Sequence, residues 1–212
     1  MRLLSLIIIA ASISFSSFAQ SNDDFSDTRT KKESFEKQKD KIFRSDLSGF
    51  TLAGIDESIG KSEMEKIPYS EYGTNFMTFE ANGIKATVTT APFVTGKHKM
   101  DYDEKYLIKI DKKPYYGNYG KLPLTMIKSI TLTINGDSVN IPPSAYFDLY
   151  NLNFTFKDKQ GVDRSSNGIY HSRDGHRLYL YLLCRDNSGS YEVTFVIQDK
   201  KYAFRVLDYG FM

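Results

Sequence analysis

The chain has 212 residues, with 28 Lys and Arg against 26 Asp and Glu and a formal net charge of +2. A chain so balanced has no bulk electrostatic attraction to nucleic acid or to an anionic membrane, so we expect neither as a partner. It has one Cys and no Trp, and its Tyr and Phe must therefore build a core that no disulfide supports.

The first twenty residues are typical of a secretory signal peptide. Arg2 precedes an apolar run, and Ser17-Phe18-Ala19 places small residues where a signal peptidase requires them. The run is too short and too often interrupted by Ser to span a bilayer core of about 30 Å. We therefore expect cleavage of residues 1–19 and export of a soluble protein to the periplasm or beyond, without a lipid anchor or membrane insertion.

The segment before the main domain is expected to contain an arm and a short helix. Residues 20–34 are polar and of mixed charge, which predicts a disordered arm. Apolar residues recur at helical spacing within 32–47 and predict a short amphipathic helix at the start of a single domain over 35–212. Residues 58–67 predict another helical turn, which Pro68 ends.

From Thr74 onward the pattern is that of an antiparallel β protein. Asn-Gly and Asp-Gly pairs between alternating segments accept the positive φ angles of type I′ hairpin turns. Three such turns are predicted, at Asn82-Gly83, Asn135-Gly136 and Asp174-Gly175. Further strands are predicted at 105–110, 153–158 and 201–207. About nine strands without βαβ spacing indicate an all-β fold, an antiparallel sandwich or open barrel of roughly 8–10 strands.

The C-terminal stretch 177–207 predicts a three-stranded meander. Its first strand, "RLYLYLLC", is apolar on both faces and is expected to lie centrally or under another element, with the Cys184 thiol buried and inert. In its middle strand one face is apolar and the other wetter. The apolar face carries Tyr191, Val193, Phe195 and Ile197, and the wetter face Glu192, Thr194 and Gln198.

Several polar clusters resemble sites but have simpler interpretations. The stretch "RDNSGSYE" (185–192) fails the spacing of an EF-hand and of a serine nucleophile, and predicts a turn. His171 and His176 fall near a hairpin tip, in a register that pairs His171 with Leu178, and lack further ligands for zinc. The stretch "HKMDYDE" (98–104) fits a charged loop. We therefore predict no catalytic residues, no metal and no cofactor.

The most unusual stretch is "KKPYYGNYGKLP" (112–123), which its Gly and Pro residues predict to be a loop. Its tyrosines either cover the open end of the sandwich or form a binding surface. On the second interpretation Tyr115, Tyr116 and Tyr119 are the contact residues of a non-catalytic binding module. A protein partner is favoured over a glycan because the chain has no Trp. The alternative is a carbohydrate-binding module or a glycan-directed hydrolase whose carboxylates come from separate strands.

Overall fold

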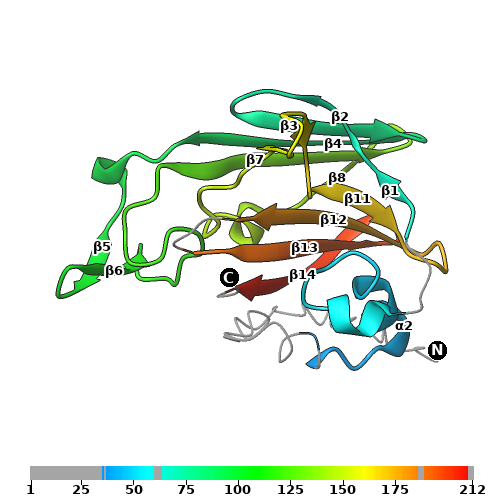
Figure 1. Cartoon of the computed structure of the whole chain (residues 1–212), viewed down its shortest axis with the longest axis horizontal. Helices are drawn as coiled ribbons and strands as arrows, with labels where there is room; N and C mark the ends of the chain where they lie inside the picture. Colours follow the sequence, from blue (N-terminus) through cyan, green and yellow to red (C-terminus); the bar gives the residue numbers. More distant parts are fainter. Residues whose placement is uncertain (1–34, 36, 60–63, 186–188, 210–212) are drawn as a thin grey trace, which may run out of the picture.

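The computed structural model describes residues 35, 37–59, 64–185 and 189–209, so the predicted signal peptide and arm lie outside the described residues. Two five-stranded antiparallel sheets pack face to face (Figure 1), which confirms the predicted all-β sandwich with a short helix. Sheet A has the order β1-β11-β12-β13-β14, and sheet B the order β2-β3-β4-β7-β8.

Sheet A consists of β1 (Lys66–Ile67), β11 (Gly168–His171), β12 (Arg177–Cys184), β13 (Tyr191–Gln198) and β14 (Lys201–Tyr209). Sheet B consists of β2 (Tyr69–Tyr72), β3 (Phe76–Ala81), β4 (Ile84–Pro92), β7 (Thr125–Ile134) and β8 (Asp137–Val139). Two small hairpins are formed by β5 (Met100–Asp103) with β6 (Tyr106–Ile110), and by β9 (Phe156–Lys157) with β10 (Asp163–Arg164). The helix α2 spans Lys41–Leu47, and short 3-10 turns occupy Ile55–Ser58, Thr95–Lys97 and Pro143–Ala145.

Both Asn-Gly turns have the predicted geometry. Asn82 and Gly83 have φ angles of 52° and 76°, and Asn135 and Gly136 have 53° and 87°, so each pair forms the two-residue turn that joins its strands. These local turns fix the register of β3 with β4 and of β7 with β8.

The third turn differs in detail from the prediction. The register of β11 with β12 pairs His171 with Leu178, as expected, but only Gly175 of the Asp-Gly pair has a positive φ. The Gly175 N–H donates to the Ser172 carbonyl at 3.0 Å, and the Ser172 hydroxyl contacts the Asp174 carboxylate at 2.6 Å. Side-chain hydrogen bonds therefore shape this turn in place of a second left-handed residue.

The main core lies between the two sheets. The apolar face of β13 points into it as predicted, and each of its four side chains is at most 1% exposed. Cys184 is also fully buried, with its Sγ atom 3.1 Å from the carbonyl oxygen of Asn151, so the predicted buried thiol is confirmed.

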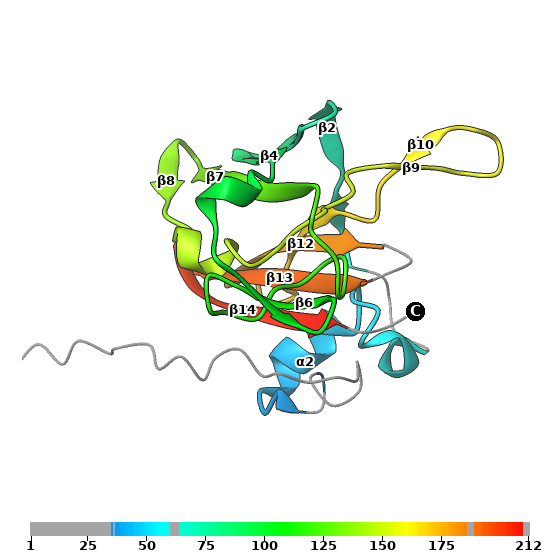
Figure 2. The same ribbon diagram turned by 90° about the vertical axis from the view of Figure 1, so that its left-hand side faces the viewer.

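The outer face of sheet A is covered by residues 35 and 37–59, which include α2 (Figures 1 and 2). This segment forms a second apolar core with the side chains of β11, β12, β13 and β14 that face away from sheet B. Its buried members are Phe35, Phe43, Leu47, Met64, Tyr170, Tyr179, Tyr181, Leu183, Val196 and Val206. The strand β12 is thus buried on both faces, as predicted.

The same cover makes one prediction wrong. The face of β13 that was expected to be wetter is buried except at its end: Glu192 and Thr194 are each 2% exposed, whereas Gln198 is exposed as predicted. The two Glu192 oxygens accept the Leu52 and Ala53 N–H groups, both at 2.7 Å, and one of them also accepts the Tyr181 hydroxyl at 2.6 Å. The carboxylate therefore satisfies backbone donors of the covering segment.

The helix predicted within 32–47 is interrupted: residues 35 and 37 are helical and residues 38–40 are not, while residues 32–34 and 36 lie outside the described residues. The helix α2 begins at Lys41, where the Asp40 carboxylate accepts the N–H groups of Ile42 and Phe43 at 2.9 and 3.1 Å. The second predicted helical turn, 58–67, is wrong at its end, because residues 66–67 form β1, and residues 60–63 of it lie outside the described residues.

Candidate interaction surface

One end of the sandwich carries most of the exposed apolar side chains. Residues 94–124, which include the β5–β6 hairpin and the tyrosine-rich loop, project from the ends of β4 and β7 (Figure 1, left). Of the thirteen large apolar side chains exposed in the described residues, seven lie here: Val94, Tyr102, Tyr106, Ile108, Tyr119, Leu122 and Leu124. We call these seven residues the end surface.

The hairpin in this region corrects the expectation of a charged loop at 98–104. Residues 100–103 form β5, and only Glu104 and Lys105 make the turn, Glu104 with a φ of 51°. The charges of this stretch concealed an alternation in which Met100 and Tyr102 point to one face and the acidic residues to the other.

A β-bulge allows the hairpin to bury two side chains of β6. Asp101 pairs with Lys109 and Tyr102 with Leu107, so Ile108 is the extra residue. Leu107 and Ile110, three apart in sequence, are consequently both buried. They form a small core with Tyr150, against which Phe93, Met100, Tyr115 and Met126 pack. This small core holds the β5–β6 hairpin, which carries part of the end surface, against the end of the sandwich.

A histidine–aspartate contact closes the base of the hairpin. The His98 Nδ1 atom lies 2.7 Å from Asp111, whose other carboxylate oxygen accepts the Lys99 N–H at 2.8 Å. The His98 ring stacks on Phe93 with centroids 4.6 Å apart. The hydrogen bond with His98 lowers the pKa of the Asp111 carboxyl below its usual range.

The structure places the three predicted loop tyrosines in three different environments. Tyr116 is 7% exposed and belongs to the main core, and its N–H donates to the Asp148 carbonyl at 2.9 Å. Tyr115 is half-buried, and burial raises the pKa of its hydroxyl. Tyr119 is 82% exposed. The loop therefore combines the two interpretations, because Tyr116 covers core while Tyr119 faces solvent.

Tyr115 organises the loop from within. Its hydroxyl lies 3.1–3.3 Å from the carbonyl oxygens of Leu107, Asn118 and Lys121. The Leu107 N–H also donates to the Gly120 carbonyl at 3.1 Å, so the loop is joined to β6. These contacts hold the backbone that presents Tyr119.

Two exposed tyrosines of the end surface were missed as site residues. Tyr102 and Tyr106 are each 50% exposed and flank the hairpin turn. Tyr106 packs on Gly120, where an added Cβ would lie 3.0 Å from the tyrosine ring and where φ is +74°, so this contact needs glycine. The alternation of Tyr102 with Asp101 and Asp103 was the sequence signal that could have identified it.

The same end carries an excess of positive charge. Residues 93–124 contain seven Lys against four Asp and Glu, a net charge of +3, whereas the whole chain has +2. The Lys residues are all exposed. Three of the four acidic residues, Asp101, Asp103 and Glu104, lie in β5 and the turn that follows it, so the positive excess comes from the rest of this region.

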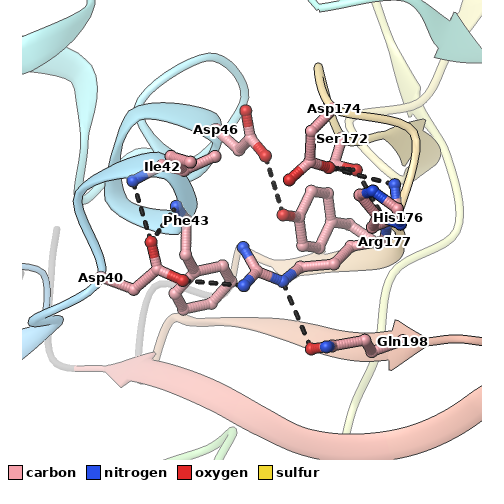
Figure 3. A network of polar contacts seen from close by, with 10 residues as sticks. Asp40, Ile42, Phe43, Asp46, Ser172, Asp174, His176, Arg177 and Gln198 are labelled. Carbon is pink, nitrogen blue, oxygen red and sulfur yellow. Dashed lines mark hydrogen bonds and ion pairs between the residues drawn. The ribbon is translucent and has the colours of Figure 1, made fainter.

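The other polar clusters have structural roles. In Figure 3, Arg177 contacts Asp40 at 2.7 Å and Gln198 at 3.4 Å, which joins the start of α2 to sheet A. Tyr179 donates to the buried Asp46 at 2.9 Å. In the part of the chain that the structure describes, no three His, Cys, Asp or Glu side chains are grouped so that they could hold a metal ion.

The stretch "RDNSGSYE" joins the neighbouring strands β12 and β13, and residues 186–188 of this predicted turn lie outside the described residues.

Comparisons with known protein families, characterised proteins and solved structures found no match. Among the described residues, no helix has the length and apolar character needed to cross a membrane.

Proposed function

We propose that this chain is an exported, non-catalytic protein-binding module that contacts its partner through the end surface. The observation that carries the proposal is the concentration of seven of the thirteen exposed large apolar side chains in residues 94–124. Clustered exposed apolar side chains surrounded by polar residues are typical of interaction sites.

The composition of the end surface favours a protein over a glycan. Tyr, Leu, Ile and Val occupy it, whereas sugar-binding platforms depend on broad aromatic planes and the chain contains no Trp. Tyrosines supply a large amphipathic contact area at a low cost in conformational entropy. The exposed charged residues of the same region fit the polar rim that is usual in protein interfaces.

Two of the four buried carboxylates among the described residues have structural roles that make them poor candidates for the catalytic pair of a hydrolase. Asp148 accepts two hydrogen bonds from the Arg205 guanidinium, both at 2.7 Å, and Glu192 holds the covering segment. Neither group is available as a general acid or base.

The proposal of export rests on the signal-like N-terminus. Mass spectrometry of the native protein should find a mature N-terminus near Gln20, and an intact Met1 would contradict export by this route.

A site-specific photocrosslinker tests the binding proposal. Incorporated at Tyr119, it should give a discrete crosslinked protein in a cell-envelope fraction, and the same probe at the exposed Tyr72 of β2 is the control. The double variant Tyr102→Ser/Tyr106→Ser should remove the product without lowering the melting temperature by more than a few degrees. A product that forms equally at both probe positions, or none at Tyr119, would contradict the proposed surface.

A further inference from the structure

The strand β5 has a free edge on the side away from β6. The N–H groups of Leu107 and Ile110 donate to Gly120 and Lys113, at 3.1 and 3.0 Å, and so point away from β5. Their register partners on β5 are Tyr102 and Met100. In an antiparallel ladder such non-hydrogen-bonded pairs direct the backbone groups of both strands outward. The N–H and C=O groups of Met100 and Tyr102 therefore line the outer edge of β5.

This edge is open in the part of the chain that the structure describes. There, β5 pairs with β6 alone, and no hydrogen bond from another described residue reaches the backbone groups of Met100 or Tyr102. Tyr102 is 50% exposed, and its hydroxyl lies 3.8 Å from the Met100 sulfur, so the two side chains line one face of the edge. An open edge beside an exposed aromatic side chain is a template for an added strand.

The other face of the same edge is acidic. Asp101 and Asp103 alternate with the apolar pair, and Glu104 follows at the turn. Within the hairpin, Asp101 is opposite Lys109, whereas Asp103 is opposite Tyr106 and faces no cation across the ladder. An incoming strand would therefore find carboxylates on one face and apolar groups on the other, and opposite charges across strands stabilise such pairs.

We propose that β5 takes up an extended segment of a partner protein, in which Lys or Arg alternates with apolar residues, as an added antiparallel strand. The inference rests on the proposed function and assigns the chemistry of the partner at this surface. The basic residues face Asp101 and Asp103, and the apolar ones lie beside Met100 and Tyr102.

A second copy of this chain is a less favourable occupant. The antiparallel register with Met100 opposite Tyr102 sets Asp101 opposite itself, and the register with Tyr102 opposite itself sets Asp101 opposite Asp103. The register with Met100 opposite itself avoids an Asp–Asp pair, but it sets Tyr102 opposite His98, which lies before β5. Like charges directly opposite each other destabilise a strand pair. The acidic residues thus oppose self-pairing in both registers that use Tyr102 within the strand, while they attract a basic strand.

The test uses isotope-labelled protein and two heptapeptides blocked at both ends. In one peptide Lys alternates with Val, and in the other Glu replaces each Lys. The alternating Lys peptide should bind and slow hydrogen exchange of the Met100 and Tyr102 amides, while the amides of Leu107 and Ile110 keep the protection they have in the free protein. The Glu peptide should bind roughly tenfold more weakly or not at all.

Variants identify the groups that select the peptide. Asp101→Lys/Asp103→Lys should weaken binding of the Lys peptide by roughly tenfold and improve that of the Glu peptide, and the neutral pair Asp101→Asn/Asp103→Asn should fall between them. Glu71→Lys, an exposed change on the edge strand β2, is the matched control and should leave binding unchanged.

Binding of the Lys peptide without protection of Met100 and Tyr102, or an affinity unchanged in both Asp variants, would overturn strand addition. So would failure of the Lys peptide to bind. These outcomes differ from failure of the proposed function, which would appear as loss of the specific crosslink at Tyr119 whatever the peptides do.

Discussion

The clearest quantitative prediction concerns Glu192→Gln, a change of nearly equal size at a buried position. The glutamine carbonyl can keep the hydrogen bonds to Leu52 and Tyr181, but its NH2 group then faces the Ala53 N–H, and donor meets donor. Loss of a hydrogen bond to a charged group costs about 1.5–3 kcal/mol, and the two remaining bonds weaken when their acceptor becomes neutral. We expect the free energy of unfolding to fall by about 3 kcal/mol.

Urea unfolding measures this change, followed by tyrosine fluorescence and circular dichroism. Hydrogen exchange at the Leu52 and Ala53 amides should accelerate more than exchange in β4, because the covering segment loses its attachment to β13. The matched control is Glu80→Gln, at an exposed carboxylate that pairs with Lys85 at 2.8 Å and should cost less than about 0.5 kcal/mol. An unchanged or higher stability of Glu192→Gln would refute the reasoning, since burial of the charge would then outweigh its hydrogen bonds.

Three further predictions concern the loop and the covering helix. Tyr116→Ala should cost about 3–5 kcal/mol, because it empties a core position, whereas Tyr119→Ala should change the free energy of unfolding by less than about 0.5 kcal/mol in the same urea titration. Asp40→Ala should cost about 1 kcal/mol at pH 7 through loss of the helix cap. The hydrogen bond from the Phe43 N–H, aided by Arg177, lowers the pKa of the Asp40 carboxyl below 3.8. The cost of Asp40→Ala should therefore disappear as the pH falls through that lowered pKa. A cost that persists at pH 2 would contradict the assignment of Asp40 as the helix cap. Burial raises the pKa of the Asp46 carboxyl above 3.8, so the stability that this carboxyl contributes is present below pH 3.8 and is lost as the pH rises through the raised pKa. The free energy of unfolding of Asp46→Asn, relative to that of the wild type, should therefore be higher at pH 7 than at pH 3.5. The opposite trend in urea titrations at the two pH values would refute this prediction.

The parts of the fold that the sequence predicted are those that local interactions determine. Asn82-Gly83 and Asn135-Gly136 act through the backbone angles of adjacent residues, and the alternation in β13 identifies its core face without knowledge of the partner strand. The burial of Glu192 could not be predicted in this way. Its partners Leu52 and Ala53 lie about 140 residues earlier in the chain, and nothing in their sequence marks them as donors to a carboxylate.

The candidate surface was predicted in part. The Gly and Pro residues of 112–123 identified the loop, but a loop has no periodicity that separates the buried Tyr116 from the exposed Tyr119. The hairpin escaped detection because its bulge at Ile108 breaks the alternation of β6, and because charges in β5 resemble those of a solvated loop. Only tertiary contacts bring Tyr106 against Gly120 and so beside Tyr119.

The order of strands also has a consequence for how the chain folds. Sheet B draws all its strands from residues 69–139, so each can pair with a strand close to it in sequence as soon as it is synthesised. Sheet A draws four of its five strands from residues 168–209, and β1 must wait for β11, with Lys66 opposite Tyr170. Closing such a long loop is entropically costly. The strand β1, although it is synthesised early, is therefore expected to pair among the last. A chain that ends before β11 would leave α2 and its apolar residues without the surface they cover, and would expose them to aggregation.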